Sequence, residues 1–500
     1  MPNYHRYMID LMKSLGYQID DKGMCHGIVM MGVQAFLSHE LPKFKQRLKF
    51  IDTHHLDLFK QLNELKTRLA ILAADNKQRE QLQLLPQPIS FTTEEEQLID
   101  TWAFFDGVAL YFEPTRYFQQ FGESLPLHDT EKISDLASSL PLDKLGGLKD
   151  IDAWPGMYTK DELSHYLFLL DQYIRDGNQD IALTFTSKNH TIAFAYDAST
   201  QQWLLMDSNE LPPSVISVEK WAEIVATKFH ESNIIGFETL IQCTGNHASA
   251  VKKIIENVKQ DVVFQDLHEI TPEKAKRVTS RKTSLLYFAA RCGHKSIVEM
   301  LIDKGANINH AKNNGVTPLF IAAENGHKDI VEIFINKGTD INRAQYQGAT
   351  PLLIAAENGH NDIVKMLIEN GADINHAQNQ GTTPLLVAAE KGHNHVVKML
   401  IEKGAHINPA QNQGVTPLLI AAQNGHNDIV KMLIKNGAHI NQARNDGVTP
   451  LLIAAQNGHN DIVKMLIKNG AHINQAQSQG ATPLLMATQN GHKEDRKSVV

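Results

Sequence analysis

After about residue 280, the pattern of apolar and polar positions repeats with a period of about 33 residues. Each copy opens with Thr-Pro-Leu, runs through an apolar stretch to Gly-His, and then carries a second apolar stretch. Thr-Pro-Leu begins at Thr317, Thr350, Thr383, Thr416, Thr449 and Thr482. Gly-His begins at Gly326, Gly359, Gly392, Gly425, Gly458 and Gly491. A degenerate first copy runs from Ser284 to His294, so the pattern predicts seven copies, of which the last breaks off after Lys493.

Each copy predicts two short helices and a projecting finger. Thr is a good helix N-cap, and Pro fits the first helical turn, where its missing N–H is not needed. Gly after the helix favours the left-handed conformation that ends it. In the third copy, Ile363, Val364 and Leu367 give the second helix one apolar side. A single unit cannot bury that side, so the copies must stack. The period and the Thr-Pro-Leu-x-x-Ala-Ala core resemble ankyrin repeats.

The part of the chain before residue 245 shows no such period and predicts an α+β domain. The pattern there favours three helices, over residues 43–85, 93–120 and 160–176. Short strands of an antiparallel sheet follow, over residues 181–187, 190–196, 202–207 and 235–243. We therefore expect a first domain over 1–245, a helical connector over 246–282, and an all-α repeat solenoid over 283–500.

One candidate functional feature is a cysteine next to an apolar segment. Residues 26–37 are apolar on nearly every side, which predicts a helix buried in the centre of the first domain. Cys25 is expected at the N-terminus of this helix, where the helix dipole lowers the thiol pKa from about 8.5. Gly23 and Gly27 would permit a tight entry and the approach of a substrate backbone. A buried cysteine is often only a small hydrophobic side chain, so this feature needs a partner.

The partner is expected on a hairpin over residues 189–209. A four-residue loop from Asp197 to Thr200 would place His190 opposite Asp207 on one face of the sheet. The carboxylate would then fix the tautomer of the imidazole and stabilise its protonated form. A register that differs by one residue would put the two side chains on opposite faces.

Together, Cys25, His190 and Asp207 form a candidate catalytic triad of nucleophile, base and orienting acid. The oxyanion of the intermediate would need donors, which we expect from the backbone N–H of Cys25 and the side chain of Gln18 or Asn189. The alternative is a buried cysteine beside a purely structural His–Asp contact. Neither a metal nor a cofactor is expected.

Gly-x-Cys-x-Gly before an apolar helix, with a His at the head of one strand and an Asp at the end of the next, resembles the papain-like cysteine proteases. The nearest similarity is to the YopT-type effector proteases that pathogenic bacteria inject into host cells. The resemblance covers residues 1–245 and implies a papain-like fold and thiol protease activity. A protease-like domain joined to ankyrin repeats is also similar to the translocated effectors of Legionella-type intracellular bacteria. That similarity implies a virulence role in the host cytosol, without a cleaved signal peptide.

The fingers and the concave face of the repeats are expected to bind a protein partner. Copies five and six, over 415–447 and 448–480, are identical at all but three positions and differ only at the finger tip. Stacking constrains the helices, whereas the fingers are free to contact a partner; drift at a solvated turn would give the same pattern. The candidate partner-binding residues are Asn313, Asn314, Tyr346, Gln347, Asn379, Gln380, Asn412, Gln413, Asn445 and Asp446.

The composition of the chain bears on its partners, its compartment and its metal content. A formal charge of −8 over 500 residues gives no reason to expect nucleic acid as a partner. No run reaches the roughly 18 apolar residues of a membrane span, and three scattered cysteines suit a reducing cytosol. The histidines that follow glycine in each copy favour a structural hydrogen bond over a metal array, and a monomer is expected.

Three functions fit this sequence. The first is a cysteine protease, or a related acyl-transfer enzyme, that the repeats direct to its target. The second is an adaptor whose first domain keeps the fold but only binds. The third is an ankyrin scaffold in which residues 280–500 carry the whole activity.

Overall fold

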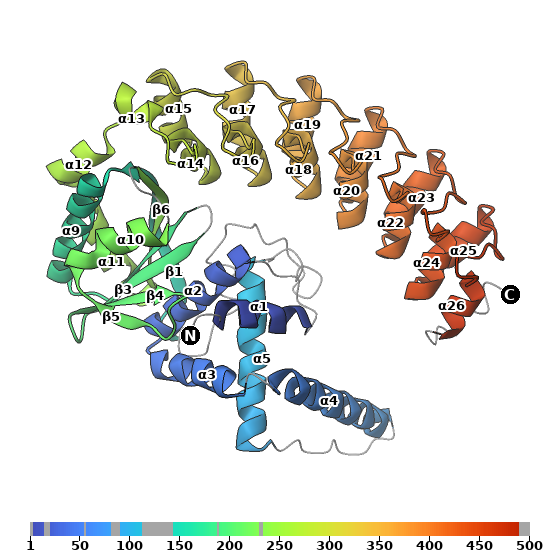
Figure 1. Cartoon of the computed structure of the whole chain (residues 1–500), viewed down its shortest axis with the longest axis horizontal. Helices are drawn as coiled ribbons and strands as arrows, with labels where there is room; N and C mark the ends of the chain where they lie inside the picture. Colours follow the sequence, from blue (N-terminus) through green and yellow to red (C-terminus); the bar gives the residue numbers. More distant parts are fainter. Residues whose placement is uncertain are drawn as a thin grey trace. The chain divides into compact units, whose positions relative to one another are not determined.

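The structure is a computed structural model, and it describes residues 4–14, 21–54, 57–81, 91–112, 144–187, 190–229 and 234–489. The chain forms two compact units, Met1–Ile270 and Thr271–Val500. Figure 1 shows a mixed sheet-and-helix unit followed by a series of helix pairs.

The first unit is built around a six-stranded antiparallel sheet. Its strands are β1 (Leu148–Tyr158), β2 (Ile181–Thr186), β3 (Thr191–Asp197), β4 (Gln202–Asp207), β5 (Ser214–Ile216) and β6 (Ile235–Thr244). The order across the sheet is β1-β6-β2-β3-β4-β5. The antiparallel sheet was predicted, but β1 and β5 were not. Pro155 and Gly156 interrupt the strand pattern of β1, and a proline is tolerated there because β1 lies at the edge of the sheet.

Alternate residues of the central strands face two different layers of helices. Phe194 and Leu205 pack with α9 (Lys160–Gly177), α10 (Trp221–Lys228) and α11 (Ala248–Gln260) in one large aromatic core. Ala193 and Met206 point to the other face, where they pack against α2 (Asp21–Leu37). The predicted buried apolar helix is confirmed, because α2 is covered by the sheet on one side and by other helices on the other.

The remaining helices of the first unit form a layer around α2. They are α1 (Tyr4–Ser14), α3 (Leu41–Thr53), α4 (Leu58–Gln81) and α5 (Thr93–Phe112). The prediction of one helix over 43–85 is wrong, since the chain turns at His54 and divides that segment into α3 and α4. Both pieces still bury the apolar positions that suggested the helix, such as Leu48 and Leu62. The predicted end of α5 near residue 120 lies outside the described residues.

The first unit continues beyond the boundary that we placed at residue 245. Helix α11 buries Val251, Ile255 and Val258 in the sheet core, and α12 (Val262–His268) adds Phe264 to the same core. The apolar side of α11 therefore belongs to the first unit. The compact unit ends at Ile270, within the segment that we described as a helical connector.

The second unit is a stack of helix pairs. Figure 1 shows the pairs side by side in chain order, with the first helix of each pair on the inner side of a curved array. A short α13 (Pro272–Lys276) comes before the stack. The pairs are α14 (Leu285–Arg291) with α15 (Lys295–Asp303), α16 (Pro318–Glu324) with α17 (Lys328–Asn336), α18 (Pro351–Glu357) with α19 (Asn361–Glu369), α20 (Pro384–Lys391) with α21 (Asn394–Glu402), α22 (Pro417–Gln423) with α23 (Asn427–Lys435), and α24 (Pro450–Asn457) with α25 (Asn460–Lys468). The first helix of the seventh copy is α26 (Pro483–Gln489), and the predicted break after Lys493 lies outside the described residues.

The predicted cap chemistry of the repeats is confirmed. The side chain of Thr317 accepts a hydrogen bond from the N–H of Phe320, and the equivalent bond recurs in the later copies. Gly392 ends α20 with a φ of 80°, in the left-handed region. These local contacts define the ends of each helix, so the period in the sequence becomes a period in space.

Candidate functional site

The β3–β4 hairpin holds two residues of the candidate triad, but in a different register from the prediction. Ile192, not His190, is paired with Asp207, and the four-residue loop runs from Ala198 to Gln201. The predicted register is therefore wrong by two residues. Side chains on a strand alternate with a period of two, so a shift of two residues keeps His190 and Asp207 on the same face.

His190 and Asp207 meet diagonally across the hairpin. The Nε2 atom of His190 lies 2.9 Å from Oδ1 of Asp207. The same oxygen accepts the backbone N–H of Asn209 at 2.9 Å, and Lys228 at the end of α10 places its Nζ 2.7 Å from Oδ2. The side chain of Asp207 is fully buried and that of His190 is 9% exposed. The carboxylate is thus held by two hydrogen bonds and one ion pair, and it in turn fixes the imidazole.

These contacts determine the charge of Asp207. Burial alone would raise the pKa of its carboxyl group, because a charged group is poorly solvated there. The hydrogen bond and charge of His190, then the contact with Lys228 and the N–H of Asn209, outweigh burial and lower the pKa of Asp207 to about 2. Asp207 is therefore an anion at neutral pH, which is what an orienting acid requires.

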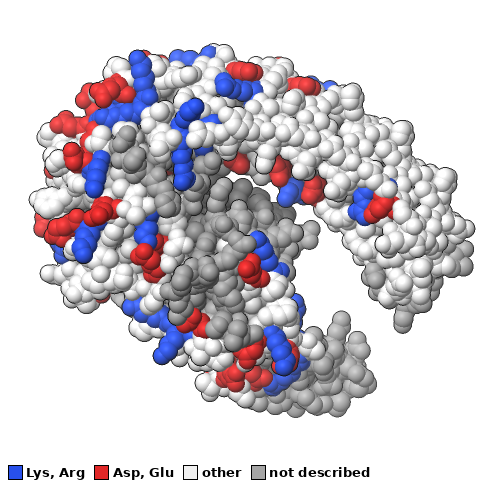
Figure 2. Space-filling model, viewed as in Figure 1, with Lys and Arg blue, Asp and Glu red and all other residues white. Residues whose placement is uncertain are grey.

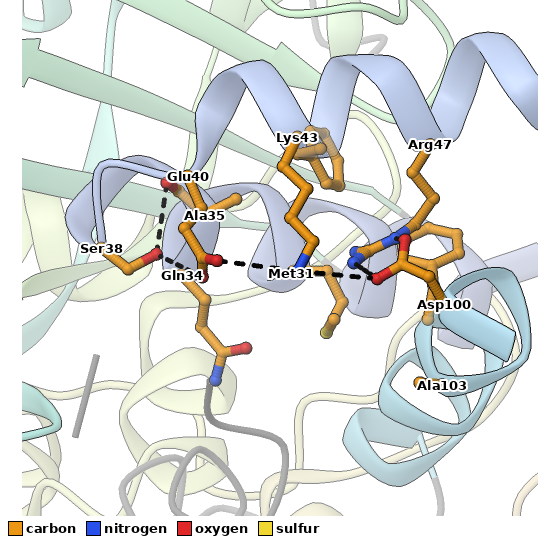
Figure 3. Close-up of a pocket in the computed structure, with 11 residues that line it drawn as sticks. Met31, Gln34, Ala35, Ser38, Glu40, Lys43, Arg47, Asp100 and Ala103 are labelled. Atoms are coloured by element: carbon orange, nitrogen blue, oxygen red, sulfur yellow. Dashed lines mark hydrogen bonds and ion pairs between the residues drawn. The ribbon is translucent and has the colours of Figure 1, made fainter. Parts of the chain in front are cut away.

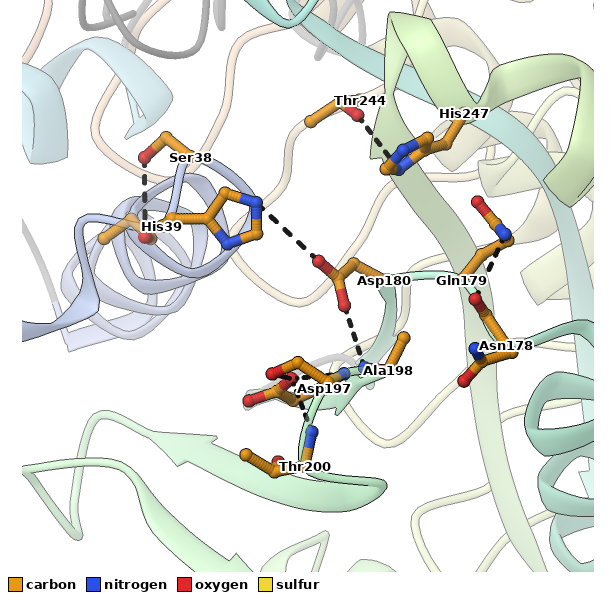
Figure 4. A network of polar contacts seen from close by, with 12 residues as sticks. Ser38, His39, Asn178, Gln179, Asp180, Asp197, Ala198, Thr200, Thr244 and His247 are labelled. Carbon is orange, nitrogen blue, oxygen red and sulfur yellow. Dashed lines mark hydrogen bonds and ion pairs between the residues drawn. The ribbon is translucent and has the colours of Figure 1, made fainter.

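Helix α2 lies along β3 from the start of that strand to its end. Near its beginning, Nδ1 of His26 lies 3.5 Å from the hydroxyl oxygen of Thr191. At its other end, Nε2 of His39 lies 3.9 Å from Oδ2 of Asp180, and Oδ1 of the same carboxylate accepts the N–H of Ala198 at 2.9 Å (Figure 4). The start of α2 and the start of β3 therefore lie together.

The backbone of Cys25 lies in α2, next to His26 in the chain, just as His190 lies next to Thr191. The candidate nucleophile and base thus flank two residues that are in contact. The side chain of Cys25, and all of Gln18 and Asn189, lie outside the described residues. The structure brings together His190 and Asp207 of the triad, and it places the backbone of Cys25 near the same end of the sheet.

The helix begins four residues before Cys25, at Asp21, and not at Cys25 as expected. The dipole effect falls off within the first turn, so it acts on Cys25 less than the sequence suggested. Only the first four N–H groups of a helix lack an intrahelical acceptor, and the N–H of Cys25 is the fifth. That N–H is therefore not suited to bind an oxyanion.

Gly27 does not leave room for a substrate backbone. A Cβ atom at this position would lie 2.6 Å from the backbone oxygen of Val108 in α5. The absence of a side chain instead lets α2 and α5 pack closely. The functional interpretation of Gly27 is wrong, and its role is in the core.

A pocket of about 210 Å³ lies at the other end of α2, between α3 and α5 (Figure 3). It is smaller than the roughly 300 Å³ or more that is usual for small-molecule sites. Arg47 forms a fork with Asp100, with distances of 2.5 and 2.6 Å, and Ser38 contacts Glu40. These charges are paired with one another, so the pocket offers no obvious chemistry of its own.

The finger tips of the repeats are linked into a continuous hydrogen-bonded row. The N–H of Tyr346 donates to the carbonyl of Asn314 at 3.0 Å, and the same bond recurs between later fingers. The side-chain amide of Asn379 donates to the carbonyl of Tyr346 at 3.1 Å, and that of Asn445 to the carbonyl of Asn412 at 3.0 Å. Several predicted partner-binding asparagines therefore hold neighbouring fingers together. Tyr346 differs from them, because its side chain is 71% exposed.

The difference between copies five and six has a local structural meaning. Arg444 and Asp446 form a two-pronged ion pair within one finger, with distances of 2.9 and 2.5 Å. In the next copy, Ser478 uses its hydroxyl group to bind the carbonyl of Asp446. These side chains stabilise the finger tip, so their variation alone does not establish a recognition edge.

The recurring histidines have the structural role that was expected. Nε2 of His327 donates to the carbonyl of Arg291 in the preceding copy, at 2.8 Å. His360, His393, His426 and His459 make the equivalent bond at 2.9 to 3.0 Å. Burial lowers the pKa of His360 and of His393. These rings join each copy to the one before it.

Acidic and basic side chains are mixed on the face of the molecule in Figure 2. Neither sign forms a large patch on that face, and over the later repeats charged side chains are few. The finger residues there are mainly uncharged Asn and Gln. None of the helices in the described ranges has both the length and the apolar character that crossing a membrane requires.

The stacked helix pairs, with capped first helices and hydrogen-bonded fingers, define a repeat solenoid of the kind that binds proteins. The family model for ankyrin repeats, in three-copy form, matches residues 239–345, 286–378, 352–444 and 418–498. Because these matches cover more than half of the chain, the protein belongs to the ankyrin-repeat family. A comparison with curated proteins gives no match.

Sequence reasoning missed two contacts of the buried carboxylate, a hydrogen bond from Asn209 and an ion pair with Lys228. An aspartate often accepts the N–H two residues later, so the bond from Asn209 could have been expected from the local sequence alone. Lys228 could not have been expected in that way. It lies far beyond Asp207 in the chain, and only the packing of α10 on the sheet brings the two together.

Proposed function

We propose that the first unit is a papain-like cysteine protease, or a related thiol acyl-transfer enzyme, and that the ankyrin repeats hold its protein target. The observation that carries this proposal is the buried Asp207 that fixes Nε2 of His190 at the start of β3. The start of α2, which bears Cys25, lies at the same end of the sheet. A Cys–His–Asp triad also requires the thiol of Cys25 to reach Nδ1 of His190.

Each proton transfer of the reaction would use His190. Nδ1 of His190 takes the proton of the Cys25 thiol, and the thiolate adds to the carbonyl carbon of the substrate. His190 then returns the proton to the leaving amine as the C–N bond breaks, and a thioester remains on Cys25. Water, deprotonated by His190, releases the acid and restores the thiol. The anionic Asp207 stabilises the imidazolium form between these steps.

The oxyanion of each tetrahedral intermediate needs donors close to the thiol. The N–H of Cys25 is the fifth of its helix, so the proposal assigns this task to the side chain of Gln18 or Asn189. Replacing the working donor with Ala should lower kcat by about 100-fold or more with little change in KM.

The rate of thiol alkylation tests the nucleophile. Iodoacetamide should label Cys25 faster than Cys292 in folded protein, with a rate profile shifted to acid pH. Cys292 is the better comparison, because burial raises the pKa of Cys243 to about 12 and that thiol is fully buried. His190→Ala should remove the advantage of Cys25. Equal labelling of Cys25 and Cys292 in the wild type would reject the enzyme.

The family match favours a second function, because ankyrin repeats bind proteins and the match supports no catalytic activity. In this alternative, the first unit is a non-catalytic adaptor. Cys25→Ala and His190→Ala would then leave every cellular effect unchanged, whereas Tyr346→Ala would weaken partner capture. A matched change at Asn379, whose side chain binds a neighbouring finger, should act mainly on stability. A full effect from residues 271–500 alone would favour the bare scaffold.

The proposal also includes a place of action. The resemblance to translocated ankyrin effectors suggests delivery into the cytosol of a host cell, where the repeats would bind a host protein. A translocation reporter fused to the full chain tests this idea. A reporter signal in host cells that depends on the secretion system supports it, and a signal that is absent or independent of that system opposes it.

A further inference from the structure

We infer that Lys228 is a positioning residue of the candidate site and that it keeps His190 neutral by acting through Asp207. This inference rests on the proposed function, because it concerns the imidazole that would deprotonate Cys25. It adds a fourth residue to the triad and a way to adjust the pH at which the site works.

The two oxygens of the Asp207 carboxylate are divided between two partners. Oδ1 lies 2.9 Å from Nε2 of His190, and Oδ2 lies 2.7 Å from Nζ of Lys228. The carboxylate therefore bridges an imidazole and an ammonium group. Because Asp207 is fully buried, little water is present to screen one partner from the other.

The position of Lys228 is determined by the packing of its helix. It is the last residue of α10, and Trp221 and Val225 of that helix are buried in the core of the sheet. The side chain of Lys228 is only 17% exposed. The ammonium group thus approaches Asp207 from the face of the sheet opposite to α2, as a fixed part of the fold and not as a mobile surface charge.

The positive charge of Lys228 weakens the stabilisation that the carboxylate gives to a protonated His190. With Lys228 in place, Asp207 is already neutralised, so a proton on His190 adds a net positive charge to a buried site. Without Lys228, the imidazolium would be the sole counter-ion of a buried anion and would be strongly favoured. The ammonium group therefore holds the pKa of His190 down and leaves the ring able to accept a proton.

Other charged and titratable groups lie on the elements around His190. Glu210 follows β4, binds Lys228 from the solvent side, and is 58% exposed. His26 on α2 contacts Thr191, the neighbour of His190. Burial opposes the charge on Lys228, but Asp207 and Glu210 together raise its pKa above the usual value. Lys228 thus remains a cation through the whole range in which His190 titrates.

The test measures the pKa of His190 in the full chain, by NMR of the histidine ring carbons and protons. The signal is assigned by its absence in His190→Gln. Lys228→Gln should raise the pKa of His190 by about one unit, and Lys228→Arg, which keeps the charge, should hold it near the wild-type value. An unchanged pKa in Lys228→Gln, or equal shifts in the two variants, overturns the inference.

A third variant covers the case in which Lys228→Gln does not fold. Glu210→Gln removes an exposed carboxylate and leaves Lys228 with Asp207 as its remaining acidic partner within the described part of the chain. The full charge of Lys228 then acts on the site, so the pKa of His190 should fall. A fall supports the inference, and no change or a rise contradicts it.

The same samples separate this inference from the proposed enzyme. The iodoacetamide rate at Cys25 is measured against pH in wild type and in Lys228→Gln. If the pKa of His190 rises and the rate profile moves with it, both ideas hold. If the pKa rises while the profile does not move, Lys228 controls His190 but His190 does not activate Cys25. The inference then stands and the triad is rejected.

Discussion

The two units of this chain are stabilised by different kinds of contact. In the second unit, the same few bonds recur from copy to copy, such as the one from His327 to the carbonyl of the preceding copy. In the first unit, the important contacts occur once and join distant segments, as Lys228 and Asp207 do. When one recurring contact is lost, the equivalent contacts of the other copies remain. When a unique contact is lost, no equivalent contact remains. Single substitutions should therefore be costlier in the first unit.

The largest loss of stability is expected at the buried carboxylate. Asp207→Ala leaves Lys228 without its buried partner and should lower the free energy of unfolding by about 3–5 kcal/mol. All four tryptophans precede residue 222, so tryptophan fluorescence in a urea titration reports on the first unit alone. Glu210→Gln, at the exposed carboxylate on the same lysine, should cost less than about 1 kcal/mol. If Asp207→Ala and Glu210→Gln lower the free energy of unfolding equally, the buried contact of Asp207 with Lys228 is no more important than the exposed one of Glu210.

A slightly smaller loss is expected where α2 meets α5. Gly27→Ala introduces a Cβ atom at 2.6 Å from a backbone oxygen, which a rotamer change cannot relieve. We expect a cost of about 3 kcal/mol, at the upper end for overpacking. Gly32→Ala is the matched control, because its nearest neighbour at 3.3 Å is the flexible side chain of Met206. If Gly32→Ala is as costly as Gly27→Ala in the same fluorescence titration, close helix packing is not the reason for Gly27.

Acid should destabilise the first unit through Asp207. Its pKa is about 2 when folded and about 3.9 in an unfolded chain, so its contribution is complete above about pH 5 and is lost as the pH falls towards 2. This group alone accounts for about 2.6 kcal/mol above pH 5. The measurement compares urea midpoints at pH 5 and pH 2.5 in wild type and in Asp207→Asn. The difference between the two proteins should shrink as the pH falls; a constant difference would show that the carboxylate charge is not responsible.

The smallest effect is expected in the array. Thr416→Ala removes the cap bond to the N–H of Leu419 and should cost about 1 kcal/mol, as followed by far-ultraviolet circular dichroism. Copies five and six have the same helix sequences, so Thr449→Ala should cost the same within about 0.5 kcal/mol. A larger difference between the two variants would show that position in the stack matters as much as the repeated contact.

The same contrast explains what the sequence could predict. The caps, glycines and histidines of the repeats act within one or two copies, and all of them were predicted from the period. The hairpin register was missed although a signal was present. The carboxylate of Asp197 accepts the N–H groups of Ser199 and Thr200, which makes Asp197 the last residue before the turn and not the first residue of the loop.

Other features of the first unit could not be read from local sequence. β1 was missed because Pro155 and Gly156 interrupt its strand pattern, and only the edge position in the sheet makes them acceptable. The role of Gly27 depends on Val108, which belongs to a helix much later in the chain. The candidate His–Asp pair was found because its two residues lie on one hairpin, whereas Lys228 required the packing of a separate helix.

The joints between repeats have a consequence for how the protein changes over generations. Each joint uses the same set of bonds, and copies five and six are nearly identical along their whole length. Misaligned recombination between such segments adds or removes one whole copy at a time. The neighbours of an inserted or deleted copy still find complete contacts, so the array can lengthen or shorten without new side chains. The length of the repeat array can therefore change by one copy at a time during evolution, while the first unit stays unchanged.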